Sequence, residues 1–285
     1  MAQFTNQAQL SYNGGVVNSN VAVGEILEVV SATKIAVMDD YTRGDEVTYV
    51  ISGINSGATA VTGLTITDDH GTYSFGDGVR TPLSYVDGSV RLFINGVLTT
   101  APTVTVQDNA VVFGGITLPA NSNLILIYEA AVNLYAPLDI GASIVNTATV
   151  TGSGIPTPVT VSETVTPEET PDLTITKSIE PVPVTENGTL TYRFIIQNYG
   201  NTAAVATDNV AVTDTFDPIL NVLTVTLDGT PLTLTTEYTY DVTTGVFATV
   251  PGVITVPAAT YTQDVTTGAW IITPGVTELV VTGTV

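Results

Sequence analysis

The stretch Gly44-Asp45-Glu46-Val47-Thr48-Tyr49-Val50-Ile51 recurs later in the chain as Asn187-Gly188-Thr189-Leu190-Thr191-Tyr192. Large apolar residues stand at every second position in both stretches, which is the period of a strand with one buried face. The same offset joins Lys34 to Lys177 and Asn55 to Asn198 (177 − 34 = 198 − 55 = 143). The chain is therefore expected to contain two copies of one β unit.

Two further matches follow in the same order in each copy. Leu64-Thr65-Ile66-Thr67-Asp68 corresponds to Val210-Ala211-Val212-Thr213-Asp214, at an offset of 146 (214 − 68). Phe93-Ile94-Asn95-Gly96-Val97 corresponds to Thr226-Leu227-Asp228-Gly229-Thr230. The Asn-Gly and Asp-Gly pairs predict tight two-residue turns between paired strands.

The composition supports two all-β domains. The chain has 285 residues, of which 44% are hydrophobic, with Val, Ile and Thr prominent and 15 Pro and 25 Gly between short alternating runs. No long run has the 3.6-residue period of a helix, so we expect tandem immunoglobulin-like β-sandwiches. The predicted boundaries are residues 1–24 for an N-terminal donor strand and linker, 25–165 for domain 1, 166–171 for a Pro-rich linker and 172–285 for domain 2.

Charge and cysteine content exclude several function classes. The net charge is −21 with only six basic residues, which argues against a nucleic-acid partner and against binding to anionic membranes. Without cysteine the chain has neither disulfides nor thiolate metal sites. Neither a signal peptide nor a membrane-spanning apolar run is recognisable, so no membrane insertion is expected and the export route is not apparent.

The N-terminal stretch Phe4-Thr5-Asn6-Gln7-Ala8-Gln9-Leu10-Ser11-Tyr12 resembles a segment in mid-chain, Ile144-Val145-Asn146-Thr147-Ala148-Thr149-Val150-Thr151. Both contain the frame Asn-x-Ala-x-(Leu/Val), at an offset of 140 (146 − 6). The mid-chain segment is expected to close domain 1, whereas domain 2 is expected to lack its last strand. We therefore predict that the N-terminal strand completes domain 2 of a neighbouring copy, through an interface of Phe4, Asn6, Ala8, Leu10 and Tyr12.

Such an exchange predicts a head-to-tail homopolymer, a structural fibre whose partner is the chain itself. The alternative is a monomeric two-domain adhesin or stalk whose N-terminal strand closes on its own second domain. An enzyme is not expected, and no cofactor or metal is assigned. His70 is the only histidine, lacks a nucleophile-elbow sequence beside it and is expected in a surface loop.

The two lysines are the only ones in the chain, and alternation places each on an apolar face. Burial lowers the pKa of a lysine and raises that of a carboxylic acid, so a Lys–Asp pair in a core can be largely neutral. A neutral amine is a nucleophile, and a nearby asparagine carboxamide is a natural electrophile. The simpler interpretation is a salt-bridged lysine, a turn aspartate and ordinary strand sequence.

Several of these motifs resemble the conserved-repeat Ig-like domain of bacterial and archaeal surface proteins. The motifs are Asp172-Leu173-Thr174-Ile175-Thr176-Lys177-Ser178, Gly188-Thr189-Leu190-Thr191-Tyr192, Val212-Thr213-Asp214 and Asn146-Thr147-Ala148-Thr149-Val150. Two copies cover nearly the whole chain. The resemblance implies a stalk, adhesin or envelope component. We expect the protein to be extracellular or on a cell or spore surface.

The Lys, Asp and Asn positions also resemble those of the isopeptide-forming Ig-like domains of Gram-positive pilins and adhesins. There a first-strand Lys joins a last-strand Asn, assisted by an acidic residue on the opposite sheet. Carried over, domain 1 would hold Lys34, Asp68 and Asn146. Domain 2 would hold Lys177 and Asp214, with Asn6 supplied by the next subunit.

Overall fold

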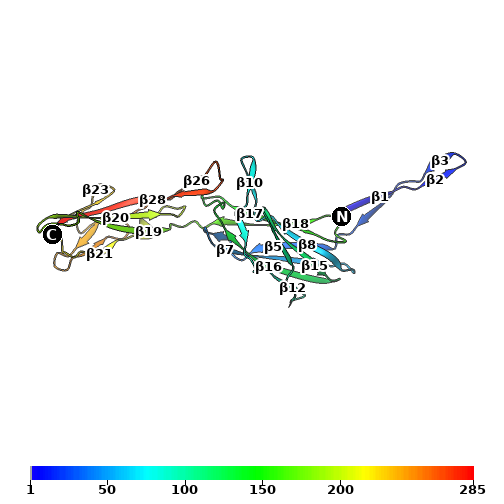
Figure 1. Ribbon diagram of the computed structural model, residues 1–285, viewed down its shortest axis with the longest axis horizontal. Coiled ribbons are helices and arrows are strands. Elements are labelled where there is room, and N and C mark those ends of the chain that lie inside the picture. Colours follow the sequence, from blue (N-terminus) through cyan, green and yellow to red (C-terminus); the bar gives the residue numbers. More distant parts are fainter. Residues whose placement is uncertain (1) are drawn as a thin grey trace. The chain divides into compact units, whose positions relative to one another are not determined.

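A computed structural model describes residues 2–285 (Figure 1). The chain is built from strands, with one 3-10 helix, Ala206–Asp208, so the all-β prediction is confirmed. It divides into two compact units. The first runs to Pro137 and also takes up Ala142–Thr166, and the second comprises Leu138–Gly141 and Pro167–Val285. Each unit contains an immunoglobulin-like β-sandwich.

In the first unit, one six-stranded sheet has the order β13-β12-β16-β7-β5, with β11 also paired to β16. Its strands are β5 (Val30–Ala36), β7 (Glu46–Asn55), β11 (Leu83–Tyr85), β12 (Arg91–Ile94), β13 (Val97–Leu98) and β16 (Ser122–Val132). Alternation along β7 buries Val47, Tyr49 and Ile51 against the second sheet, as their spacing predicts.

The opposite sheet of the first unit has the order β14-β15-β8-β17-β18-β6. Its strands are β6 (Asp40–Tyr41), β8 (Val61–Asp68), β14 (Thr103–Gln107), β15 (Ala110–Leu118), β17 (Ile144–Thr151) and β18 (Val159–Pro167). A short hairpin, β9 (Tyr73–Phe75) with β10 (Gly78–Arg80), stands apart from both sheets. The segment 144–150, expected to be the closing strand of domain 1, lies in β17, but β18 follows it in the same sheet and is the last strand of the unit.

The second unit repeats one of these sheets and part of the other. Its larger sheet has the order β19-β20-β28-β22-β23, built from β19 (Leu173–Glu180), β20 (Thr189–Asn198), β22 (Asn221–Leu227), β23 (Thr230–Pro231) and β28 (Gly275–Thr284). The facing sheet has only β21 (Thr213–Thr215), β25 (Val246–Thr249) and β24 (Tyr238–Tyr240). A further hairpin joins β26 (Thr260–Gln263) to β27 (Trp270–Thr273).

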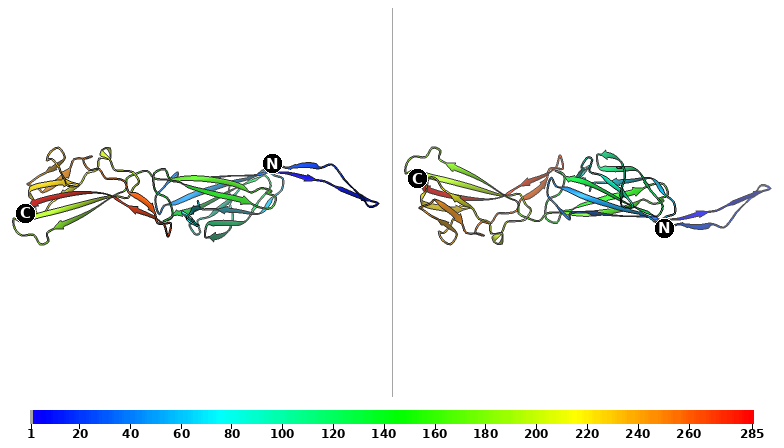
Figure 2. Two further views of the ribbon diagram at one scale, coloured as in Figure 1. Left: turned by 90° about the horizontal axis from the view of Figure 1, so that it is seen from above. Right: turned by 90° about the horizontal axis from the view of Figure 1, so that it is seen from below.

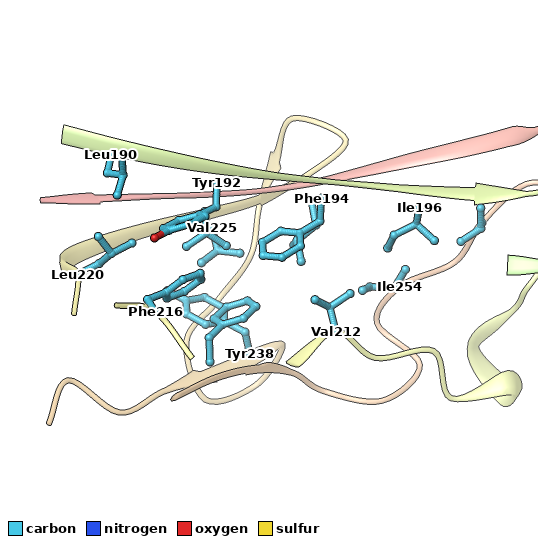
Figure 3. Packing of buried hydrophobic residues seen from close by; sticks show 14 of the residues in the cluster. Leu190, Tyr192, Phe194, Ile196, Val212, Phe216, Leu220, Val225, Tyr238 and Ile254 are labelled. Atoms are coloured by element: carbon cyan, nitrogen blue, oxygen red, sulfur yellow. The ribbon is translucent and has the colours of Figure 1, made fainter. Parts of the chain in front are cut away.

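The core of the second unit lies between these two sheets (Figure 3). It is a cluster of buried apolar residues that includes Tyr192, Phe194, Phe216 and Phe247. The Tyr192 and Phe216 rings stack with their centroids 4.7 Å apart. This cluster is the counterpart of the first unit's core, and it holds the three-stranded sheet in place.

Equivalent residues make equivalent contacts in the two units. Asn55 and Asn198 are fully buried, and each accepts a hydrogen bond from the backbone N–H two residues later, at 3.0 and 2.9 Å. The hairpins β12–β13 and β22–β23 both turn through an Asn-Gly or Asp-Gly pair with positive φ at both positions, as predicted. The two sequence copies are therefore two copies of one fold.

The difference lies at one sheet edge. In the first unit β8 is flanked by β15 on one side and by β17 on the other, with β18 and β6 beyond. In the second unit β21 corresponds to β8, β25 to β15 and β24 to β14. Among the described residues, β21 pairs with β25 alone. On the edge of β21 that corresponds to the position of β17 in the first unit, residues 2–285 supply no strand.

The N-terminal segment is a hairpin rather than a strand followed by a linker. β1 (Ala2–Asn6) pairs with β4 (Ala22–Ile26), and β2 (Gln9–Tyr12) pairs with β3 (Gly15–Asn18). Asn13 and Gly14 form the turn, both at positive φ. Figure 2 shows these strands in blue, and none of them pairs with a strand of either sandwich.

Candidate functional site

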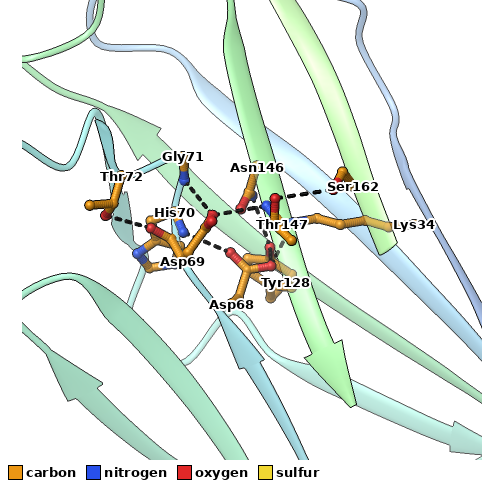
Figure 4. Close-up of polar contacts among 10 residues, drawn as sticks. All are labelled: Lys34, Asp68, Asp69, His70, Gly71, Thr72, Tyr128, Asn146, Thr147 and Ser162. Carbon is orange, nitrogen blue, oxygen red and sulfur yellow. Dashed lines mark hydrogen bonds and ion pairs between the residues drawn. The ribbon is translucent and has the colours of Figure 1, made fainter. Parts of the chain in front are cut away.

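Lys34 and Asp68 meet in the core of the first unit, between its two sheets (Figure 4). Lys34 lies on the inward face of β5 and Asp68 at the end of β8. The Lys34 Nζ lies 2.6 Å from the Asp68 Oδ2, and both side chains are 0% exposed. The ammonium position is also 4.7 Å from the centre of the Tyr49 ring. Both members of this Lys–Asp pair thus lie fully inside the sandwich, on the apolar faces of their strands.

Tyr128 on β16 links this pair to Asn146 on β17 (Figure 4). Its hydroxyl donates to Asp68 Oδ2 at 2.6 Å and accepts from Asn146 Nδ2 at 3.2 Å. Asn146 is fully buried, and its side-chain oxygen has no hydrogen-bond partner within residues 2–285. The site therefore gathers an amine, a carboxylate and a carboxamide from three strands, with Tyr128 connecting the last two.

Burial controls the electrostatics of this site. Loss of solvent lowers the pKa of Lys34, and the nearby charge of Asp68, the next largest influence, works against that shift. Burial likewise raises the pKa of the Tyr128 hydroxyl well above its usual value, so it remains a proton donor. A lysine with a lowered pKa is more readily deprotonated to the nucleophilic amine.

His70 is buried, so its prediction as a surface-loop residue was wrong. Its backbone N–H donates to Asp68 Oδ1 at 3.1 Å, which fixes the carboxylate from the side opposite Lys34. The residue has positive φ at the turn after β8, and this turn directs its ring into the sandwich. Burial lowers the pKa of His70. A histidine next to a turn-forming Asp-Asp pair gave no sequence signal for this inward orientation.

Tyr128 is a site residue that no sequence motif indicated. Buried positions alternate with less buried ones along β16, and Tyr128 lies on the buried face directly opposite Tyr49 of β7. The signal that could have found it is that alternation, because the hydroxyl of a buried tyrosine usually finds a hydrogen-bond partner.

The second unit holds a corresponding but exposed pair. Lys177 on β19 hydrogen-bonds Asp214 on β21, and its Nζ lies 4.5 Å from the centre of the Tyr192 ring. The Lys177 side chain is 41% exposed and that of Asp214 is 17% exposed. The lysine, aspartate and tyrosine thus repeat the arrangement of Lys34, Asp68 and Tyr49, but solvent reaches them.

Two positions of the site differ between the units. Val281 is opposite Tyr192 in the second unit, where Tyr128 is opposite Tyr49 in the first. Phe216 stands two residues after Asp214, as His70 stands two residues after Asp68. The second unit therefore lacks the tyrosine hydroxyl that connects carboxylate and carboxamide, as well as the histidine.

The predicted donor residues are all in the N-terminal hairpin, and all are exposed. Asn6 pairs with Ala22 across β1 and β4, and Phe4 lies over Gly24, where an added Cβ would come within 2.3 Å of the ring. Phe4, Leu10 and Tyr12 are 52%, 64% and 58% exposed. Ala8 accepts a hydrogen bond from Ser19 N–H at 2.8 Å and so continues the ladder between the two strand pairs.

Residues 2–285 contain no group of three His, Asp or Glu side chains placed to hold a metal ion. The aspartates of the two Thr-Thr-Gly turns act locally: Asp241 and Asp264 accept from Thr243 N–H and Thr267 N–H at 2.8 and 2.7 Å. Within the same residues, no helix is long and apolar enough to cross a membrane.

No protein-family model matches this chain, and no curated protein does. Solved structures with a similar fold include pilins of Gram-positive bacteria. The pilus backbone RrgB of Streptococcus pneumoniae is 12% identical over 86% of this chain and 55% of its own, with a TM-score of 0.36. The major pilin BcpA of Bacillus cereus is 13% identical, over 96% of this chain and 73% of its own, with a TM-score of 0.34.

The full-length major pilin SpaD of Corynebacterium diphtheriae is 11% identical, over 86% of this chain and 59% of its own, with a TM-score of 0.36. This chain thus spans little more than half the length of the pneumococcal and corynebacterial pilins. At such identities the likeness concerns the fold alone.

Proposed function

We propose that this chain is a structural subunit that polymerises head to tail into an extracellular or surface fibre, by exchange of its N-terminal segment. The observation that carries the proposal is the contrast between the two lysine sites. The Lys34 side chain is 0% exposed and that of Lys177 is 41% exposed, although both contact an equivalent aspartate and tyrosine.

The open edge of β21 is the acceptor in this proposal. An unpaired sheet edge above a partly exposed core is a template for strand addition. Leu173, Ile175 and Ile179 share the inward face of β19 with Lys177, and they are 37%, 53% and 43% exposed. A strand added at β21 would lie beside Asp214, as β17 lies beside Asp68 in the first unit, and would shield this face from solvent.

The N-terminal segment is the donor. It carries the sequence frame of β17, and its apolar side chains are exposed. Burying a large apolar side chain contributes roughly 1.5–3 kcal/mol, before the cost of ordering is subtracted. A contact between one end of a subunit and the other end of the next is heterologous, so it grows into a filament unless the ring closes.

The proposal includes covalent locking by Lys–Asn isopeptide bonds. In the first unit the neutral Lys34 amine attacks the Asn146 side-chain carbonyl carbon. An N–C bond forms, the C–N bond to the carboxamide nitrogen breaks, and ammonia leaves with the proton that Asp68 has passed from the amine. Lys177, Asp214 and the neighbour's Asn6 would react in the same way between subunits. The lowered pKa of Lys34 and the partnerless Asn146 oxygen support this chemistry.

Electron microscopy of the purified protein tests polymerisation. We expect filaments from the intact chain and none after deletion of residues 2–12. The matched control is Gln9→Ala, an exposed residue whose side chain points away from the proposed interface. Filaments that persist after the deletion contradict strand exchange, and a monomer from the intact chain would leave the adhesin or stalk alternative.

Boiling the filaments in detergent tests covalent locking. We expect a ladder on a denaturing gel that Lys177→Ala and Asn6→Ala each abolish, with the intact mass lower by one ammonia for each bond. Lys34→Ala is the matched control, because it should retain the ladder and remove only the ammonia loss inside the first unit. Complete dissociation of wild-type filaments into monomers of unreduced mass would disprove the cross-link.

A further inference from the structure

The N-terminal segment has a partner strand within itself, and this changes what can be exchanged. β1 and β2 pair with β4 and β3 along residues 2–26, closed by the Asn13-Gly14 turn. An isolated two-stranded hairpin is only marginally stable in water. Here its large apolar side chains are mostly exposed, so the hairpin has the features of an element that is completed by a further surface.

The first unit shows how such a hairpin is accommodated. β17 pairs with β8 on one side and with β18 on the other, so β17 and β18 together form an antiparallel pair added to the edge of β8. Asn146 and Ala148 on the inner face of β17 are fully buried. Val165 on β18 is also fully buried, which shows that the outer strand contributes to the core as well. Both strands are therefore needed to close that sandwich.

The second unit lacks counterparts of both strands among the described residues. A single added strand at β21 would replace β17 only. The exposed inward face of β19, which includes Ile175 and Ile179, corresponds to the inward face of β5, on which Lys34 is buried in the first unit. Two strands, rather than one, are thus needed at the open edge of β21 to match the first unit.

We infer that the complete N-terminal hairpin of a second copy docks on β21, with β1–β2 in the place of β17 and β3–β4 in the place of β18. This inference rests on the proposed polymer and specifies its joint. The partner is another copy because the hairpin repeats, in the same chain, the sequence frame and strand pairing that complete the first unit.

The repeat offsets also define the register of the joint. Thr149 is opposite Thr67 in the first unit. The offset of 140 relates Thr149 to Gln9, and the offset of 146 relates Thr67 to Thr213. Gln9 of one copy is therefore expected opposite Thr213 of the next. By the same offsets, Ala8 is opposite Asp214 and Leu10 is opposite Val212. In the first unit Asn146 lies two residues before Ala148, the residue opposite Asp68. In the joint, Asn6 would likewise lie two residues before Ala8, the residue opposite Asp214. This position brings Asn6 close to Lys177.

Cysteine pairs can test both parts of the inference, because the chain has no native cysteine. Thr5 and Val23 are directly opposite in the hairpin, and Thr5→Cys with Val23→Cys would lock β1 to β4 by a disulfide. We expect the oxidised variant to form filaments in the same yield as its reduced form. Loss of filaments on oxidation, with normal filaments on reduction, would show that a single strand is exchanged and would leave the proposed polymer intact.

A second pair tests the register and the identity of the partner. Mixing a Gln9→Cys chain with a Thr213→Cys chain should give a disulfide-linked pair of chains, whereas Gln7→Cys mixed with Thr213→Cys should give little. Preferential linkage of position 7 would overturn the register. In the double variant Gln9→Cys/Thr213→Cys, a monomer with an internal disulfide would overturn the second-copy assignment. If no form makes filaments, the proposed function fails as well.

Discussion

Lys34 and Lys177 have an equivalent aspartate and an equivalent tyrosine as neighbours, but different access to water. Each lies on the first strand of its sandwich, contacts an aspartate across the core and lies over a tyrosine ring, at 4.7 and 4.5 Å. Only the first is enclosed. The repeated motif therefore places the pair in both units, whereas the buried pair is in the unit whose aspartate strand is flanked by β17 and β18.

That distinction matters for chemistry. Removing water from a lysine penalises its charged form and so favours the reactive amine. In the first unit, the strands of a single chain already exclude water from Lys34. If the second unit acquires its missing strands from a neighbour, the same change in environment occurs at the moment of assembly, and reactivity is coupled to polymerisation.

Removing the aspartate should have the largest effect, and it should differ between the units. Asp68→Ala leaves the Lys34 amine buried without its partner, so we expect the free energy of unfolding of the first unit to fall by about 3–5 kcal/mol. Asp214→Ala should cost the unpolymerised second unit about 1 kcal/mol or less, because solvent already reaches Lys177.

Urea unfolding can separate these effects. Trp270 is the only tryptophan and lies in the second unit, so its fluorescence reports that unit while circular dichroism reports both. Equal losses for the two variants would show that the difference in exposure between Lys34 and Lys177 does not affect stability.

Tyr128→Phe should have an intermediate effect, confined to the first unit. The change removes the hydroxyl that donates to Asp68 and accepts from Asn146, and it leaves buried polar groups without partners. We expect a loss of about 1–3 kcal/mol in the free energy of unfolding, measured by urea denaturation.

Tyr85→Phe is the matched control, because the Tyr85 hydroxyl accepts only one long hydrogen bond, at 3.4 Å from Val90 N–H. A Tyr128→Phe variant as stable as this control would mean that the Tyr128 hydroxyl does not hold the site together.

Ile175→Asn should have the smallest effect on the stability of the free subunit, because more than half of this side chain is already exposed. We expect a change within about 0.5 kcal/mol. Filament formation should nevertheless decrease, because the docked hairpin would then cover a polar carboxamide. Thr176→Asn, on the outward face of the same strand, should leave both unchanged. Equal filament yields from the two variants, measured by electron microscopy, would show that this face of β19 is not covered in the fibre.

The strand content, the duplication and the Asn-Gly and Asp-Gly turns followed from the sequence, because alternation and turn chemistry are local properties. Alternation also placed Lys34, Asp68 and Asn146 on inward faces. The inward orientation of His70 did not follow, since it depends on one positive-φ residue in the turn after β8. The role of Tyr128 did not follow either, because its partners are 60 and 18 residues away along the chain.

The N-terminal segment shows the same division. The frame around Asn6 predicts its likeness to β17. Its pairing with residues 15–26 was not predicted, because those residues carry no clear motif in common with β18. The sequence by itself therefore determined the fold, the repeat and the residues that face inward, because these depend on neighbours one or two positions away. The burial of Lys34 and the exposure of Lys177 followed only from the tertiary structure, because burial depends on strands that distant segments, or a different copy, must supply.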